Sequence, residues 1–252
     1  MLKVENICLS FDGLKAVNNV SMNIEDGKIT ALIGPNGAGK TTTFNIIAGV
    51  YKPDSGHIYL DGEDIAGLKP YQICRKGITR TYQVIKLFNG MSVLDNVLVG
   101  MHTKLNSNFI RDILHVGRSR SEEKAAEEKA RELLKLVGLG GYEMFPAGSL
   151  PYGRQRLLEI ARALASDPKI ILLDEPAAGM NSKEKNDLNT RIREIAKRGT
   201  TVLIVEHDMS LIMDIADQIY VLNTGCNLAE GTPKEIASNQ EVIEAYLGRG
   251  DN

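Results

Sequence analysis

The sequence has few cysteines, little net charge and no long uncharged apolar stretch. It holds 3 cysteines in 252 residues, namely Cys8, Cys74 and Cys226, and none of them forms a CxxC pair. An odd, scattered set fits a reducing compartment better than a disulfide scaffold. The 30 Lys and Arg nearly balance the 32 Asp and Glu, which leaves a formal charge of −2. Nothing global therefore attracts the chain to nucleic acid or to anionic lipid.

The sequence also shows no segment that targets or spans a membrane. No uncharged apolar run approaches the roughly 18 residues of a transmembrane helix. The first residues, Met1–Glu5, include an acid where a secretory signal would have its apolar core. We therefore expect a cytoplasmic protein that is peripheral on the inner face of the cell membrane, with any membrane contact made through a partner.

Short apolar runs alternate with helical periodicity along the chain. Ile29–Ile33, Ile170–Leu173 and Thr201–Val205 read as strands that are buried on both faces, and such strands predict a mainly parallel α/β sheet. A second group of strand-like segments is joined through Asp-Gly or Thr-Gly turns and predicts a smaller antiparallel sheet beside the first. This group consists of Val4–Phe11, Val20–Ile24, His57–Leu60 and Ile219–Leu222.

Helix formers replace the strand signal in the middle of the chain. Ser121–Val137 predicts a helix with Glu127 and Arg131 paired one turn apart. Thr232–Glu235 is a capping box that predicts a further helix, and Gly248 would end the last one. We expect one domain over 1–252, with a core of about 1–83 and 160–232, a helical insertion of about 84–159 and C-terminal helices of about 233–248.

A phosphate-binding motif follows the first of the buried strands. The sequence GPNGAGKT at 34–41 matches GxxxxGK[ST] between the strand Ile29–Ile33 and the helical stretch Thr42–Ala48. Small residues let backbone N–H groups face phosphates, Lys40 adds a charge, and the Thr41 hydroxyl can ligate Mg²⁺. The predicted phosphate-binding residues are Gly34, Pro35, Asn36, Gly37, Ala38, Gly39, Lys40, Thr41 and Thr42.

Acidic residues and a histidine follow the other two buried strands. Asp174 and Glu175 come directly after Ile170–Leu173, where Asp174 can hold Mg²⁺ and Glu175 can polarise a water. His207 follows Thr201–Val205, at the strand end where open α/β sheets bind ligands. The other histidines, His57, His102 and His115, lack this setting and are expected at the surface.

Together these motifs resemble the ATP-binding cassette (ABC) ATPases over essentially the whole chain. Three further strings are similar to the ATP-binding subunits of branched-chain amino acid importers. They are DEPAAGMN at 174–181, EHDM at 206–209 and EAYLG at 244–248. The resemblance implies an ABC-type P-loop NTPase with a helical subdomain, which uses ATP and Mg²⁺ to power the import of branched-chain or related amino acids. It also implies transmembrane permease subunits, a nucleotide-dependent dimer and a second, paralogous ATP-binding subunit.

The resemblance assigns roles to residues outside the phosphate loop. Phe11 would stack on adenine, Gln83 would contact Mg²⁺ and the attacking water, and His207 would act as the switch histidine. In the signature element, which in the family reads Leu-Ser-Gly-Gly-Gln, this chain has LPYGR at 150–154. Pro151 replaces the serine, and Gly153 remains to bind nucleotide. The loop at 178–181 ends in Asn181 where an aspartate is usual.

Other readings share parts of this pattern. A soluble ABC switch acting on ribosomes or DNA would bring a second cassette or a coiled-coil insertion, and a small-molecule kinase would need a lid and an acceptor pocket. The ATPases of lipopolysaccharide exporters are similar in sequence and differ in cargo. The apolar segment Val84–Phe88 either packs inside the insertion or lines a groove that grips a permease helix.

Overall fold

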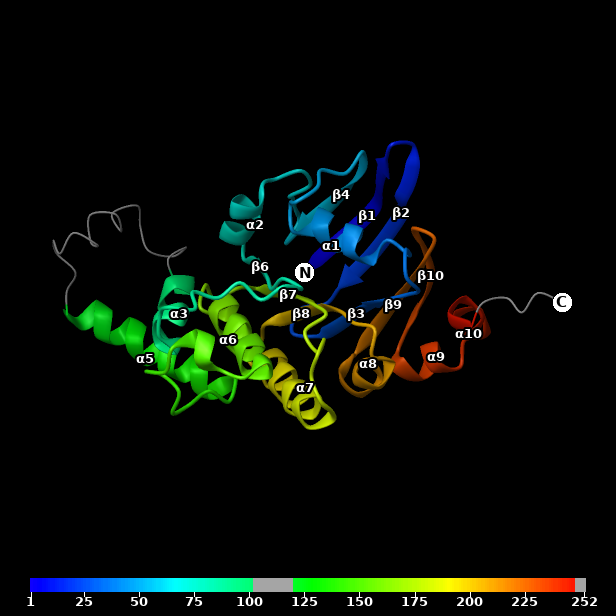
Figure 1. The fold of residues 1–252 in the computed structure, drawn as a ribbon. Helices are drawn as coiled ribbons and strands as arrows, with labels where there is room; N and C mark the ends of the chain where they lie inside the picture. Colours follow the sequence, from blue (N-terminus) through cyan, green and yellow to red (C-terminus); the bar gives the residue numbers. More distant parts are fainter. Residues whose placement is uncertain (102–119, 248–252) are drawn as a thin grey trace.

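The computed structural model describes residues 1–101 and 120–247, which form two β-sheets surrounded by helices (Figure 1). The strands of this part are β1 (Leu2–Phe11), β2 (Leu14–Ile24), β3 (Ile29–Ile33), β4 (Ser55–Leu60), β5 (Glu63–Asp64), β6 (Ile78–Arg80), β7 (Ile170–Asp174), β8 (Thr201–Val205), β9 (Gln218–Asn223) and β10 (Cys226–Gly231). The helices are α1 (Lys40–Ile47), α2 (Pro70–Lys76), α3 (Val93–Gly100), α5 (Arg120–Leu136), α6 (Tyr152–Leu164), α7 (Ser182–Lys197), α8 (Met209–Ile215), α9 (Pro233–Ala237) and α10 (Gln240–Leu247), with a 3₁₀ turn, η2 (Ala147–Ser149). The predicted α/β class is confirmed. His102, His115 and Gly248 lie outside the described residues.

The larger sheet has the strand order β10-β9-β3-β8-β7-β6. Its strands are parallel except β10, which runs antiparallel to β9. Asp174 at the end of β7 pairs with Val205 at the end of β8. The residues that follow these two strands therefore emerge side by side at one edge of the sheet, which is where a ligand site is expected.

Side chains alternate between the two faces of this sheet. On β7, Ile171 and Leu173 belong to the cluster that includes residues of α3, α5, α6, α7 and α8. Ile170 and Leu172 point the other way, into the cluster shared with α1 and the smaller sheet. All five residues of β7 are buried. This is why the strand reads as a continuous apolar run while still packing two separate cores.

The smaller sheet is antiparallel and has the order β2-β1-β4-β5. It contains three of the four segments predicted for it. The fourth prediction was wrong, because Ile219–Leu222 lies in β9 and runs parallel to β3 in the larger sheet. Its residues are at most 2% exposed. A strand covered on both faces fits the interior of the parallel sheet, and the Thr-Gly turn after it leads only to β10.

Among the described residues, α3 and α5 lie in the predicted helical region, and α6 begins in it. The helix expected at Ser121–Val137 is α5, and Arg131 pairs with Glu127 at 2.6 Å as predicted. Helix α6 begins at Tyr152, directly after Pro151. The capping box at the start of α9 is present, with Thr232 Oγ1 accepting from the Glu235 N–H. None of the helices in the described ranges is long and apolar enough to cross a membrane.

Candidate active site

The loop between β3 and α1 depends on glycines with positive φ. Gly34, Gly37 and Gly39 have φ values of 147°, 79° and 93°. A Cβ on Gly34 would lie 2.1 Å from the carbonyl oxygen of Leu222, and one on Gly39 would lie 2.5 Å from that of Ala16. These are backbone contacts, so a side chain fits at neither position. The close packing shapes a loop whose N–H groups, with the start of α1, can surround an anion.

Lys40 opens α1 and is held inside this loop. It is 5% exposed, and its Nζ donates to the carbonyl oxygens of Gly34 at 2.7 Å and Pro35 at 2.8 Å. Burial lowers the pKa of the Lys40 ammonium, while the Glu175 carboxylate partly opposes this shift. A phosphate would offer the ammonium a charged acceptor in place of neutral carbonyls. Among the other predicted loop residues, Asn36, Gly37 and Thr41 are exposed, Pro35, Gly39 and Thr42 are half-buried, and Gly34 and Ala38 are buried.

The three residues predicted to be catalytic meet around one carboxylate. Glu175 Oε2 accepts from Gln83 Nε2 at 2.9 Å, and Glu175 Oε1 lies 2.8 Å from His207 Nε2. Glu175 follows β7 and donates its N–H to the carbonyl of Val205 at 2.9 Å, which extends the pairing of β7 with β8. The parallel register therefore brings Glu175 and His207 together, whereas Gln83 arrives from the loop after β6.

Phe11 lies at the end of β1, next to the phosphate loop. Its ring is 42% exposed and packs edge-on against Tyr51, with the ring centroids 5.3 Å apart. The strand β2, which follows Phe11 in the same hairpin, runs alongside the phosphate loop. Ala16 lies against Gly39 of that loop, and the Asn18 N–H donates to the carbonyl of Gly225. An exposed aromatic face at this place can stack on a nucleotide base.

The signature element forms the start of α6 and does not join the groups around Glu175. Pro151 takes the N-cap position, and Gly153 is buried against Glu184 at the start of α7. Arg154 stacks over the Tyr142 ring at 4.3 Å. Asn181, which stands where the family usually has an aspartate, caps α7 by accepting from the Glu184 N–H at 3.0 Å.

Two charged residues that the sequence motifs did not predict organise this region. Glu206 is 4% exposed; its Oε1 accepts from the Ala177 N–H at 2.7 Å, and its Oε2 accepts from the His207 N–H at 3.0 Å. It thereby joins the turns that follow β7 and β8. Arg80 pairs with Asp174 at 2.6 Å. The sequence feature that could have identified Glu206 and Arg80 is a charged residue directly at the end of a buried strand.

The residues predicted to hold Mg²⁺ are Asp174, Thr41 and Gln83. Asp174 is 3% exposed and contacts Arg80, whose other nitrogen Nη1 donates to Asn45 Oδ1 at 2.5 Å. Asn45 lies one turn after Thr41 on the same face of α1, so Asp174 approaches the face that carries the Thr41 hydroxyl. Within the described ranges no three His, Cys, Asp or Glu side chains cluster as a metal site. One carboxylate, a hydroxyl and the Gln83 amide suit Mg²⁺ held mainly by phosphate oxygens and waters, and they do not suit zinc.

Comparison with known proteins gives matches over nearly the full chain. The ABC transporter family model matches residues 17–178, and a model for the branched-chain amino acid ATP-binding cassette transporter matches residues 226–252. The chain is 46% identical to the high-affinity branched-chain amino acid transport ATP-binding protein BraF of Pseudomonas aeruginosa, covering 98% of each chain.

Solved structures agree with this family match. A nucleotide-free ATP-binding cassette from an ABC transporter superposes with a TM-score of 0.85 and 34% identity, covering 99% of each chain. The dimeric cassette MJ0796 superposes with a TM-score of 0.77 and 27% identity over 92% of this chain and 99% of that one. The order of strands and helices described above is thus that of a known class of nucleotide-binding domains.

Proposed function

Because the chain belongs to the ABC transporter family, we propose that Glu175, Gln83 and His207 are the residues with which it hydrolyses ATP. It is an ATPase coupled to transport. The observation that carries the assignment of these residues is their meeting beside the phosphate loop, with Glu175 bonded to both partners. A carboxylate held in this way can take the proton of a water that attacks the γ-phosphate.

The phosphate loop and the residues around it have separate roles in this reaction. Lys40 exchanges its two carbonyl acceptors for the β- and γ-phosphate oxygens, and the N–H groups of the loop hold the remaining oxygens. Phe11 stacks on the adenine. His207 and Gln83 orient the Glu175 carboxylate and the water. When bound, Mg²⁺ would be held by Asp174, Thr41 and Gln83 and would neutralise charge on the phosphates.

We propose that the cargo is a branched-chain or related amino acid. BraF is a high-affinity branched-chain amino acid transport ATP-binding protein, and the model that matches residues 226–252 is that of the branched-chain amino acid ATP-binding cassette transporter. This second match lies beyond the residues matched by the general ABC transporter model and supports membership of this subgroup. The cassette would act from the inner face of the membrane together with permease subunits.

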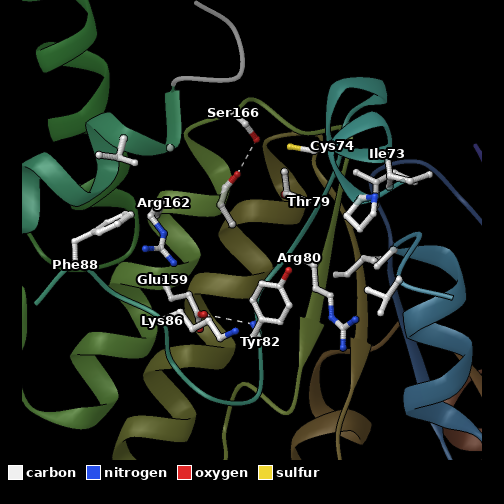
Figure 2. A pocket seen from close by; sticks show the side chains of 18 residues that line it. Ile73, Cys74, Thr79, Arg80, Tyr82, Lys86, Phe88, Glu159, Arg162 and Ser166 are labelled. Carbon is white, nitrogen blue, oxygen red and sulfur yellow. Dashed lines mark hydrogen bonds between the residues drawn. The ribbon is translucent and has the colours of Figure 1, made fainter. Parts of the chain in front are cut away.

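A groove beside the site can receive a segment of the permease. Its volume is about 520 Å³, and it lies between α2 and β6 on one side and α3 and α6 on the other (Figure 2). Ile73, Val99 and Phe88 line it together with the charged Arg162 and Glu159. Because Tyr82 and Phe88 flank the loop that carries Gln83, we propose that a cytoplasmic helix in this groove senses whether Gln83 engages nucleotide.

The segment after Gln83 is exposed and does not form a buried turn. Val84 is 72% exposed and Phe88 is 48% exposed, whereas Leu87 packs against the helical core. This arrangement favours the groove over the internal packing that the sequence left open. We propose that the insertion of about 84–159 contacts the permease and that the core of about 1–83 and 160–232 holds nucleotide, with C-terminal helices at about 233–248.

Replacement of Lys40 tests the phosphate-loop assignment. Lys40→Ala should reduce ATP hydrolysis by at least about a hundredfold, because it removes a charge that stabilises the transferring phosphoryl group. Lys124→Ala, at an exposed position of α5, is the matched control and should hydrolyse ATP at the parent rate. Steady-state release of phosphate by the purified subunit measures both. A Lys40→Ala variant as active as the control would contradict the assignment.

Replacement of Phe88 tests the permease groove. Phe88→Ser should reduce amino acid uptake by cells severalfold while ATP affinity of the purified subunit stays within about twofold, because the groove loses apolar surface and the phosphate loop loses nothing. Val84→Ser, in the same segment but outside the groove lining, is the control and should transport normally. Recovery of the permease with the tagged subunit from detergent-solubilised membranes gives a second readout. Equal transport by both variants would exclude this groove as the coupling site.

A further inference from the structure

Arg80 faces the carboxylate that the proposed function gives to Mg²⁺. Its Nη2 lies 2.6 Å from Asp174 Oδ2, and the two side chains are only 10% and 5% exposed. Burial of both partners distinguishes this ion pair from the solvent-exposed pairs of the molecule. The pair lies at the carboxyl edge of the larger sheet, where Arg80 ends β6 and Asp174 ends β7.

The surroundings hold Arg80 in place. Its guanidinium lies over the Phe44 ring at 5.9 Å and over the Tyr82 ring at 5.5 Å, and Nη1 donates to Asn45 at 2.5 Å. Figure 2 shows Arg80 and Tyr82 next to each other at the end of the groove. The buried Nε has no hydrogen-bond partner within the part of the chain that the structure describes. The ion pair, the bond to Asn45 and the two aromatic rings therefore hold the guanidinium beside Asp174.

We propose that Arg80 is a resident counter-cation that limits the affinity of the site for Mg²⁺. The inference rests on the proposed role of Asp174 as a Mg²⁺ ligand. A guanidinium bound to Asp174 Oδ2 competes with a divalent cation for the same oxygen. A guanidinium that remains nearby after the metal binds also repels the metal, because both are positively charged. In the nucleotide-free protein the same contact holds the Asp174 carboxylate in place without a metal. Arg80 is therefore a positioning residue. It holds the Asp174 carboxylate in a fixed position, and it lowers the affinity of the site for the metal.

The effect can be measured without catalysis by using Mn²⁺ as the probe. Electron paramagnetic resonance of free Mn²⁺, titrated into the full-length protein with saturating ADP, gives the metal affinity directly. Arg80→Met and Arg80→Gln both remove the charge, and Arg80→Gln keeps an N–H donor for Asp174 and thereby protects the fold. Both should bind Mn²⁺ about tenfold more tightly than the parent protein, as expected for loss of one charge close to a divalent ion.

Two further variants separate charge from structure. Arg80→Lys retains the charge and should bind Mn²⁺ within about twofold of the parent, whereas a purely structural arginine would make Lys behave like Gln. Arg75→Met removes an arginine from the exposed end of α2 and should change nothing. Unchanged or weaker Mn²⁺ binding by both neutral variants would overturn the inference.

Asp174→Asn distinguishes failure of this inference from failure of the proposed metal site. It should weaken Mn²⁺ binding at least tenfold if Asp174 is a ligand. If Asp174→Asn has no effect, the proposed metal site is wrong and the inference falls with it. If Asp174→Asn weakens binding while the neutral Arg80 variants do not strengthen it, only the role of Arg80 is wrong.

Discussion

At the scale of single residues, Glu175 adopts a backbone conformation that residues other than glycine seldom use. Its φ is 45°, in the left-handed region, directly after the last residue of β7. Such a conformation costs of order 1 kcal/mol and persists only where the surroundings enforce it. Here the enforcing contacts are the bond from the Glu175 N–H to Val205 and the two bonds from its carboxylate. The strain turns the side chain from the strand towards Gln83 and His207.

This geometry predicts what Glu175→Gln does. Glutamine has the same shape and can still bond with Gln83 and His207, so ATP affinity should stay within about threefold of the parent. The amide cannot accept a proton from water, and hydrolysis should fall by about 10² to 10⁴-fold. ATP retained after rapid gel filtration, compared with phosphate release, measures the two effects. A hydrolysis rate equal to that of the parent would mean that another residue acts as the general base.

At the scale of elements, the turn after β8 is stabilised by the residue that caps the next helix. Asp208 is the N-cap of α8, and its Oδ1 accepts from the N–H groups of Ser210 at 3.1 Å and Leu211 at 3.3 Å. Its Oδ2 pairs with Lys185 of α7 at 2.6 Å. The bonds with Lys185 and Ser210 lower the pKa of Asp208 to about 2. Because His207 directly precedes Asp208, the cap also constrains the direction in which His207 leaves the strand.

Asp208→Ala should therefore destabilise the fold by about 1–2 kcal/mol at neutral pH, since it removes a helix cap and a partly exposed ion pair. A carboxyl whose folded pKa lies below its unfolded value of about 3.9 stabilises the protein above that value. The stabilisation is lost as pH falls through about 2. Urea unfolding at pH 7 and near pH 3.5 should show the difference between variant and parent shrinking at the lower pH. A constant difference would mean that the ion pair and the charged cap contribute little.

The elements that the sequence predicted well are those with a local signature. The strands Ile29–Ile33 and Thr201–Val205 have the predicted bounds, and the glycines and Lys40 lie where the motif requires. The wrong placement of Ile219–Leu222 arose because a short apolar run does not say which sheet it joins. Arg80 was missed for a similar reason, since its partner Asp174 is 94 positions away and no local pattern links the two.

At the scale of the whole molecule, one buried side chain joins the two parts that would respond to nucleotide. Arg156 of α6 is fully buried; its Nη1 donates to the Tyr82 carbonyl at 2.5 Å, and its Nη2 donates to the Gln83 carbonyl at 2.7 Å. It also pairs with Glu159 at 2.8 Å. The loop that presents Gln83 is thus tied to the helix that starts at the signature element. A shift of Gln83 towards nucleotide would carry the start of α6 with it.

The start of α6 bears on how two copies assemble. The resemblance to ABC ATPases implies that the signature element of one subunit binds the γ-phosphate held by the phosphate loop of the other. The first N–H groups of α6 have no acceptor inside the helix and can bind an anion, but Pro151 supplies neither a hydroxyl nor an N–H. The side chains of Tyr152 and Arg154 contact other residues of the same chain, since Tyr152 Oη lies 3.3 Å from Arg156 and Arg154 stacks on Tyr142.

We therefore expect the ATP-bound homodimer to be weak and the isolated subunit to be a poor, mostly monomeric ATPase that gains activity with its permease and a second cassette. In a Glu175→Gln background, where ATP stays bound, Pro151→Ser should strengthen dimerisation by about tenfold or more, since one hydrogen bond to a charged oxygen is worth about 1.5–3 kcal/mol. Pro151→Ala restores the N–H without the hydroxyl and should give a smaller gain. Sedimentation velocity with ATP and Mg²⁺ measures all three proteins. If neither variant gains dimer affinity over the Glu175→Gln protein, the proline does not weaken the composite site, and weak assembly would need another cause.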